Sequence, residues 1–324
     1  MDQTTNPETI LDIASAFMSS KLLFAASQFG LFEKIGTAGK TLEDLSAEMK
    51  LSKRRLRILA DAMVALGFLT KKNDRYENSE EALSFLSGSE SEGLRPFLLF
   101  WDQISYQKWT KVQEAFRGES IFGEFRFTEE EQHIFSAGIE SITNSIARIL
   151  PEVYDFSGHH AVLDLGGGTG TYLKSIVEQC PHLKATLCEL PQVAGIAQKQ
   201  LASHGEKIQV LACDLQKDPI PEGHDVVLMA NVMHIFSPER NRKLLSSVRK
   251  RVPGNTKLLL IDFWTDATHT KPLVSALLAA EFLIASGQGD AYSVEEVSGW
   301  LSETGWTFLS HQTLSGPFSL IVAS

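Results

Sequence analysis

The feature that most constrains this chain is an alternation of short apolar runs and helical segments that begins near residue 160. The runs "AVLDL", "ATLCEL", "IQVLACD", "DVVLM", "KLLLID", "WTFLSHQTL" and "FSLIVAS" are each apolar enough for a strand, and helical periodicity separates most of them. Strands joined by helices form a mainly parallel sheet with right-handed crossovers. We therefore predict an α/β fold with a Rossmann-like, doubly wound, mostly parallel seven-stranded sheet.

The first of these strands runs into a glycine loop, "VLDLGGGTGTY". Such a loop between a strand and a helix lets the backbone approach a ligand closely, next to the N–H groups of the helix. The dinucleotide pattern GxGxxG would need glycine where Thr171 stands, and GxxxxGK[ST] is absent from the chain. The loop fits instead Asp164-x-Gly166-x-Gly168-x-Gly170. This spacing resembles motif I of the class I S-adenosylmethionine-dependent methyltransferases.

Acidic residues end the next two predicted strands, where a nucleoside ligand needs acceptors. Glu189 lies about twenty residues beyond the glycines, and a carboxylate there can accept hydrogen bonds from both ribose hydroxyls. Asp214 ends the third strand and suits the adenine amino group, with Leu215 against the ring. We add Leu190 and Asn231, which follow strand ends, to the predicted S-adenosylmethionine site.

The first half of the chain is predicted to be mainly helical. A helix over 10–35 is followed by three short helices and by "FLTKKNDRYENS", which predicts two strands around an Asn-Asp turn. Thr41 and Ser52 are suitable N-caps. This outline is that of a winged helix. The predicted domains are a winged-helix dimerisation domain (1–95), linker helices that line a substrate pocket (96–150) and a catalytic domain (151–324).

A winged helix also suggests a DNA-binding regulator, but composition argues against that function. The formal net charge is −10 and the pI is near 5.4, whereas phosphate contacts need a basic surface. The helix that would enter the major groove, "RLRILADAMVALGFL", is mostly apolar and suits packing. We expect no nucleic-acid partner.

Composition also bears on the compartment. No uninterrupted run of 18 apolar residues occurs, and the N-terminus lacks a basic segment before an apolar core, so we expect no membrane span, no signal peptide and a cytoplasmic protein. Cys180, Cys188 and Cys213 form no CxxC pair, and we expect buried free thiols without zinc or a disulfide. No Asp, Asn or His cluster at ligand spacing indicates a metal site.

His234, in "ANVMHIFSPER", is the candidate base. It follows a buried strand and precedes Ser237-Pro238, an N-cap and first-turn pair that holds the turn rigid. Ligands of parallel sheets bind at the carboxyl ends of strands, where His234 falls. Five other histidines fall in predicted loops or helix ends and are expected to be solvated: His159, His160, His182, His204 and His224.

Nearly the whole chain resembles one family, the small-molecule O-methyltransferases related to plant caffeate and animal hydroxyindole enzymes, in particular their bacterial members. The resemblance rests on "DFSGHHAVLDLGGGTG", "CELPQV", the His234 segment and "GDAYSVEEVSGWLSETGW". It implies S-adenosyl-L-methionine as methyl donor, S-adenosyl-L-homocysteine as product, a homodimer with intertwined N-terminal domains, no metal, and His234 as base. Gly166, Glu189, Asp214 and Leu215 would contact the cofactor.

The sequence departs from the family at the acids around the base. Many relatives have Asp directly after the histidine, where this chain has Ile235, and one plant-type acid position falls at Ala291, beside Asp290. The other maps onto Asp262, which is the better candidate to assist His234.

The predicted acceptor is a hydroxylated aromatic or polyketide-like metabolite. We assign five residues as pocket candidates, namely Trp101, Phe135, Trp264, Glu281 and Phe282. Three alternatives remain: transfer to carbon or nitrogen, a cofactor-binding relative that catalyses decarboxylation, hydroxylation or cyclisation, and the DNA-binding regulator.

Overall fold

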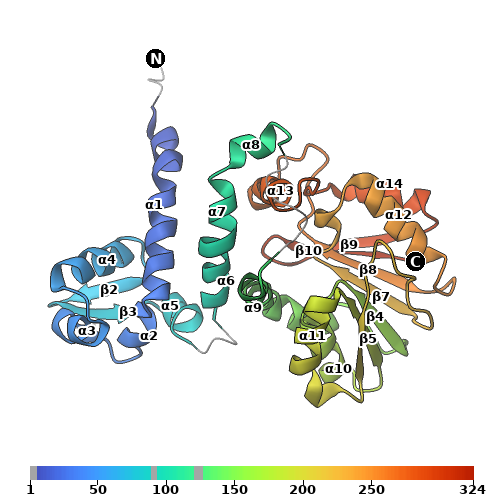
Figure 1. Cartoon of the computed structure of the whole chain (residues 1–324), viewed down its shortest axis with the longest axis horizontal. Coiled ribbons are helices and arrows are strands. Elements are labelled where there is room, and N and C mark those ends of the chain that lie inside the picture. Colours follow the sequence, from blue (N-terminus) through green and yellow to red (C-terminus); the bar gives the residue numbers. More distant parts are fainter. Residues whose placement is uncertain (1–5, 89–92, 120–126) are drawn as a thin grey trace. The chain divides into compact units, whose positions relative to one another are not determined.

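The computed structural model describes residues 6–88, 93–119 and 127–324 (Figure 1). The chain divides into two compact units. The N-terminal unit comprises Met1–Ile104 and Ala137–Ser141, and the C-terminal unit comprises Ser105–Ser136 and Ile142–Ser324. The predicted linker, 96–150, is therefore shared between the two units.

The N-terminal unit contains a small sheet surrounded by helices. Its elements are α1 (Glu8–Gln28), α2 (Leu31–Ile35), β1 (Lys40–Thr41), α3 (Leu42–Met49), α4 (Lys53–Ala65), β2 (Leu69–Lys72), β3 (Arg75–Asn78), α5 (Glu80–Phe85), α6 (Arg95–Phe100) and most of the π-helix η1 (Trp101–Ser105). The three strands pair antiparallel in the order β1-β3-β2. Helices followed by a hairpin agree with the predicted winged-helix outline.

Local signals in this unit act mostly as the sequence predicts. Asn73 and Asp74 have φ of 49° and 60°, which suits the two-residue turn between β2 and β3. Thr41 caps α3, since its hydroxyl accepts the Asp44 N–H at 3.2 Å, whereas Ser52 precedes α4 without a side-chain cap bond. The expected helix over 10–35 is wrong in one respect: it breaks at Gly30, whose φ is 68°, so α1 and α2 are separate.

Helix α1 is the unusual element of this unit, because it buries its C-terminal end and exposes large apolar side chains nearer its start. Ile10, Ile13 and Phe17 are 71%, 72% and 54% exposed. By length and composition, α1 is also apolar enough to cross a membrane, with only 11% of its most apolar stretch buried. Polar residues interrupt the apolar residues of α1, so a search for uninterrupted apolar runs in the sequence does not find this helix.

The C-terminal unit is built on a seven-stranded sheet. Its elements are α7 (Tyr106–Trp109), α8 (Val112–Phe116), α9 (Glu129–Val153), β4 (Ala161–Leu165), α10 (Thr171–Gln179), β5 (Lys184–Glu189), α11 (Pro191–Gln200), η2 (Ala202–His204), β6 (Ile208–Ala212), β7 (Val226–Ala230), η3 (Met233–Ile235), α12 (Pro238–Arg249), β8 (Lys257–Asp262), α13 (Leu273–Ser286), α14 (Val294–Glu303), β9 (Phe308–Ser315) and β10 (Phe318–Ala323). The strand order is β6-β5-β4-β7-β8-β10-β9. β4 to β8 are parallel and β10 is antiparallel to both neighbours, which confirms the predicted sheet.

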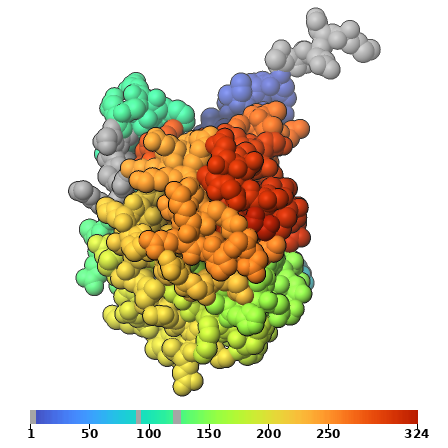
Figure 2. Space-filling model, turned by 90° about the vertical axis from the view of Figure 1, so that its right-hand side faces the viewer, coloured from blue at the N-terminus to red at the C-terminus, as the bar shows by residue number. Residues whose placement is uncertain are grey.

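Alternate side chains of the strands enter two separate cores. On one face, Val162 and Leu228 pack with residues of α9, α10 and α11. On the other, Leu163 and Met229 pack with α12 and α14. Figure 2 shows one side of this unit, where orange and red segments occupy the upper part of the surface and yellow and green segments the lower part. Because both faces are covered, a ligand can reach the parallel strands only at their ends.

The expectation of free thiols is wrong for two cysteines. Cys188 at the end of β5 and Cys213 just after β6 form a disulfide, with Cα atoms 5.6 Å apart. The two strands are parallel neighbours in which Cys188 pairs with Leu211, so Cys213, two residues further on, comes within reach of Cys188, which spacing in the sequence does not reveal. Cys180 is free and partly buried.

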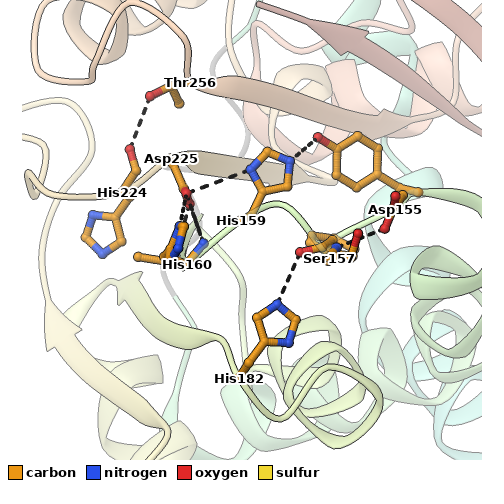
Figure 3. A network of polar contacts seen from close by, with 11 residues as sticks. Asp155, Ser157, His159, His160, His182, His224, Asp225 and Thr256 are labelled. Carbon is orange, nitrogen blue, oxygen red and sulfur yellow. Dashed lines mark hydrogen bonds and ion pairs between the residues drawn. The ribbon is translucent and has the colours of Figure 1, made fainter.

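At the amino edge of the sheet, Asp225 holds the start of β4 (Figure 3). Its carboxylate accepts the N–H groups of His160 and Ala161 at 2.9 Å each, and the His159 imidazole lies beside it. Tyr154 stacks on His159 and its hydroxyl lies 2.9 Å from Nε2. The Asp225 carboxylate is thus satisfied by backbone donors and has a structural role.

The expectation of solvated histidines is wrong for His224, which is only 8% exposed. Its Nε2 lies 2.9 Å from the Thr186 hydroxyl.

Candidate active site

The carboxyl edge of the sheet brings the predicted site residues together. Asp164 is the second-to-last residue of β4, Glu189 ends β5, and Asp214 follows the end of β6 by two residues. Asn231 follows β7, and Asp262 ends β8. Parallel register places these ends at one edge, so residues up to about a hundred positions apart become neighbours.

The glycine loop adopts backbone conformations that L-residues rarely occupy. Gly166, Gly168 and Gly170 have φ of 74°, 60° and 85°. The Gly168 N–H donates to Glu189 Oε2 at 2.9 Å, and nothing lies within 4 Å of where a Cβ would project from Gly168. The Leu190 N–H donates to the other Glu189 oxygen at 2.7 Å. These backbone N–H groups therefore fix the orientation of the Glu189 carboxylate, and the space next to Gly168 stays open.

Asp164 is the most unusual group in the unit. Its side chain is fully buried, and neither oxygen accepts a hydrogen bond from any residue that the structure describes. Burial, together with the charge of Glu189, raises the pKa of Asp164 to about 8. Gly167 covers it so closely that a Cβ at Gly167 would lie 2.2 Å from Asp164 Oδ2. A buried acceptor without a donor is costly unless a ligand supplies one.

The other two acids of the predicted cofactor site, Glu189 and Asp214, differ in environment. Burial raises the pKa of Glu189 despite its two backbone donors. The Lys217 ammonium, 2.6 Å away, outweighs partial burial and lowers the pKa of Asp214, which also accepts the Gln216 N–H. Leu215 is half-buried and packs beside the glycine loop, because a Cβ placed on Gly166 would lie 3.5 Å from its side chain.

Two further buried polar atoms lie near this edge. Within the described residues, the Tyr172 hydroxyl and the Asn231 Oδ1 have no hydrogen-bond partner. Burial, and then the charges of Asp164 and Asp262, raise the pKa of Tyr172. Carboxylates and unpartnered oxygens around a glycine loop fit a ligand rich in donors, as the ammonium and ribose hydroxyls of S-adenosylmethionine are. The residues present thus fit the cofactor.

His234 and Asp262 form a dyad beside that site. His234 Nδ1 lies 2.7 Å from Asp262 Oδ1, and Asp262 also accepts the N–H groups of Phe263 and His234. Asp262 is 1% exposed. Ala230 pairs with Ile261 across β7 and β8, so Asp262 necessarily follows beside the turn that carries His234. With Nδ1 directed to the carboxylate, Nε2 remains to take a proton.

Asp290 contributes its backbone to this turn. Its N–H donates to the His234 carbonyl at 3.1 Å, while its carboxylate accepts the N–H of Ala291. Burial raises the pKa of Asp290. No hydrogen bond joins the Asp290 carboxylate to His234 in the described chain, so the geometry favours Asp262 of the two candidate acids.

The five pocket candidates do not form one group. Phe282 stacks on His234, and Glu281 accepts hydrogen bonds from Ser105 and Trp109. Phe135 stacks on Phe127, with ring centroids 5.0 Å apart.

The two tryptophans among the candidates have packing contacts. Trp264 is buried in the core under α12 and α14 and donates to the Ser319 carbonyl, which gives it a packing role. Trp101 packs on Phe97 and Phe100 in the N-terminal unit.

Sequence reasoning missed Gly167 and Tyr172. The signal for Gly167 was present as the middle glycine of "GGG", outside the spaced pattern. Nothing in the sequence marks Tyr172, since an aromatic residue in the first turn of an amphipathic helix is usually part of the core. No three or more His, Cys, Asp or Glu side chains gather as a metal site in the part of the chain that the structure describes.

A mostly parallel sheet with an acid-flanked glycine loop at its carboxyl edge defines a nucleoside-cofactor-binding α/β enzyme. Comparison with known proteins makes this specific. Residues 102–307 match the O-methyltransferase domain, and residues 11–88 match the O-methyltransferase dimerisation domain. The chain therefore belongs to the O-methyltransferase family and is an S-adenosylmethionine-dependent methyltransferase.

Individual relatives span almost the full chain. A 3-hydroxy-5-methyl-1-naphthoate 3-O-methyltransferase of Streptomyces sahachiroi is 28% identical, covering 92% of this chain and 89% of that protein. The N,N-dimethyltransferase OxyT of Streptomyces rimosus is 25% identical over 92% of this chain and 90% of its own. Human N-acetylserotonin methyltransferase in complex with SAM has the same fold, with a TM-score of 0.88, 24% identity and coverage of 100% and 99%.

Proposed function

We propose that the protein methylates a hydroxyl group of an aromatic or polyketide-like metabolite without a metal, with His234 as general base. The observation that carries this proposal is the 2.7 Å approach of His234 Nδ1 to Asp262 at the cofactor edge of the sheet. The naphthoate O-methyltransferase among the relatives supports an aromatic hydroxyl as acceptor.

The cofactor, when bound, supplies an electrophilic methyl group. The chain's residues then have to place the acceptor oxygen in line and remove its proton. A phenol has a pKa of about 10 and is mostly protonated at neutral pH. His234 Nε2 takes that proton as the oxygen–methyl bond forms, and Asp262 stabilises the imidazolium through Nδ1. Asp164, Glu189, Asp214, Leu190, Leu215 and Asn231 hold the cofactor.

The working form is a homodimer built through the N-terminal unit. The dimerisation-domain match covers most of α1, and the exposed apolar face of α1 needs burial. We assign this face to the second subunit, and neither to a membrane nor to nucleic acid, and we place the enzyme in the cytoplasm.

The test is an acceptor screen with methyl-labelled S-adenosylmethionine, using 3-hydroxy-5-methyl-1-naphthoate, N-acetylserotonin and simpler phenols. His234→Ala should lower the rate of transfer by about 10²- to 10⁴-fold while calorimetry shows unchanged cofactor binding. Asp262→Asn should lower the rate as well, since Nδ1 loses its charged partner. An unchanged rate in His234→Ala would remove the base from the mechanism.

A second candidate function is transfer to nitrogen or carbon, which the OxyT relationship favours. An amine acceptor that is already neutral needs less help from a base, so His234→Ala would then affect transfer only weakly.

A third candidate function is decarboxylation, hydroxylation or cyclisation with the cofactor bound but its methyl group not transferred. In that case product would form while the labelled methyl group stayed on the cofactor.

A further inference from the structure

The imidazole of His234 has an aromatic ring lying flat against it. The ring centroids of His234 and Phe282 are 3.8 Å apart, and the two planes differ by 14°. Phe263, which directly follows β8, adds a tilted ring contact at 5.9 Å, so two aromatic side chains pack on the imidazole. We propose that Phe282 is a positioning residue that fixes the plane of His234 and thereby the direction of Nε2. This inference rests on the proposed role of His234 as base.

Asp262 alone does not fix the orientation of the His234 ring. One hydrogen bond from Nδ1 sets the distance to the carboxylate but leaves the imidazole free to tilt about that bond. A ring stacked on its face removes the tilt, because tilting would drive imidazole atoms into the phenyl ring. The hydrogen bond to Asp262 lies in the plane of the imidazole, and the Phe282 ring lies across that plane. Together these two contacts define the direction of Nε2.

Phe282 can perform this role only if α13 itself is held in place. Hydrogen bonds hold α13 both at the residue before Phe282 and at the end of the helix after it. The preceding residue, Glu281, is 8% exposed and accepts hydrogen bonds from the Ser105 hydroxyl at 2.7 Å and from Trp109 Nε1. These bonds join α13 to Ser105 and to α7, which belong to the same unit. A buried carboxylate with two donors holds a helix in register better than apolar contact does.

The end of α13 is tied to the turn of His234. The Ser286 hydroxyl donates to the Phe282 carbonyl and accepts the Gly289 N–H at 2.8 Å. Gly289 packs so tightly that a Cβ there would lie 2.2 Å from the His234 carbonyl oxygen. The neighbouring Asp290 N–H donates to that same oxygen. The base and its stacking partner thus belong to one hydrogen-bonded assembly.

The variant Phe282→Leu tests the proposal, with Phe318→Leu as its matched control. Phe318 is buried to a similar extent and packs on the same Phe263, with centroids 4.4 Å apart, but has no ring contact with His234. Both variants lose similar packing, so thermal unfolding should shift by similar amounts. Only Phe282→Leu should lower kcat, by about tenfold, with KM and cofactor affinity within about twofold of wild type. Phe282→Tyr, which keeps a flat ring, should restore most of kcat.

A second measurement needs no acceptor and separates this inference from the proposed function. In protein labelled with ¹⁵N-histidine, the His234 ring signals, identified by their loss in His234→Gln, should show one tautomer with the proton on Nδ1. Phe282→Leu should broaden or average these signals, and Phe318→Leu should not. Identical His234 signals in wild type and Phe282→Leu, or equal kcat losses in both leucine variants, would overturn the positioning role. If His234→Ala retained full transfer, the base would be wrong while the ring signals still reported on Phe282.

Discussion

Two aspartates on the same sheet have opposite environments. Asp225, at the amino edge, accepts the N–H groups of His160 and Ala161, and these bonds outweigh its partial burial and hold its pKa below the ordinary value. Asp164, at the carboxyl edge, is fully buried, accepts no hydrogen bond from the described residues, and has its pKa raised to about 8. Both are single acidic residues at strand ends in the sequence.

The difference separates a carboxylate that stabilises the fold from one that is kept for a ligand. A satisfied carboxylate contributes to stability in its charged form, whereas an unsatisfied buried one lowers stability when it ionises. A fold retains the second kind where function requires it. The contrast between the two edges therefore favours the carboxyl edge as the ligand site, independently of the glycine motif.

The largest expected effect is on the pH dependence of stability without cofactor. Asp164 has a folded pKa near 8 and an ordinary unfolded pKa of about 4. Its protonated form therefore contributes fully to the free energy of unfolding at low pH, and this contribution is lost as the pH rises towards 8. Stability should fall with pH across this range, by on the order of a few kcal/mol, and Asp164→Asn should flatten the slope. Chemical denaturation between pH 5 and pH 8 measures it. Parallel curves for the two proteins would show that Asp164 ionises freely in the fold.

The next effect is on cofactor affinity. Asp164→Asn keeps the shape of the side chain but cannot carry a charge, so it should weaken S-adenosylmethionine binding by about ten- to a hundredfold, as for the loss of a charged hydrogen bond. The free energy of unfolding near pH 7 should not decrease. Calorimetric titration at pH 7 measures the affinity. Wild-type affinity in this variant would make Asp164 a structural residue like Asp225.

The smallest effect is expected at the other edge. Asp225→Asn replaces an acceptor oxygen with a donor facing backbone N–H groups, so the free energy of unfolding should fall by about 1–2 kcal/mol at pH 7. Its folded pKa is lowered, so its contribution is present above about pH 4 and is lost as pH falls through the folded value. Wild type and variant should therefore converge in stability at low pH, once Asp225 is protonated in the folded protein. Cofactor affinity should be unchanged, and a loss of affinity here would break the comparison between the edges.

The sequence by itself determined the sheet and the order of its elements, and it predicted that the glycine loop, Glu189 and Asp214 lie at one edge, where the structure places them. Apolar strands alternating with helices allow few arrangements, and the glycine pattern with Glu189 and Asp214 at strand ends follows from chain-local rules. The local signals at Thr41 and at Asn73-Asp74 were also readable, because caps and turns depend on neighbouring residues only.

Contacts between distant segments needed the tertiary structure. The disulfide between Cys188 and Cys213 depends on two strands being neighbours in register, which spacing does not encode. Asp262 is preferred over Asp290 as the acid beside His234 for two reasons. The parallel pairing of β7 with β8 places Asp262 next to the turn of His234, and Asp290 contacts His234 through its backbone N–H and not through its carboxylate. The stacking of Phe282 on His234 joins residues 48 positions apart in the chain through the packing of α13. A sequence specifies which groups are present, but the direction in which a base points is decided by what packs against it.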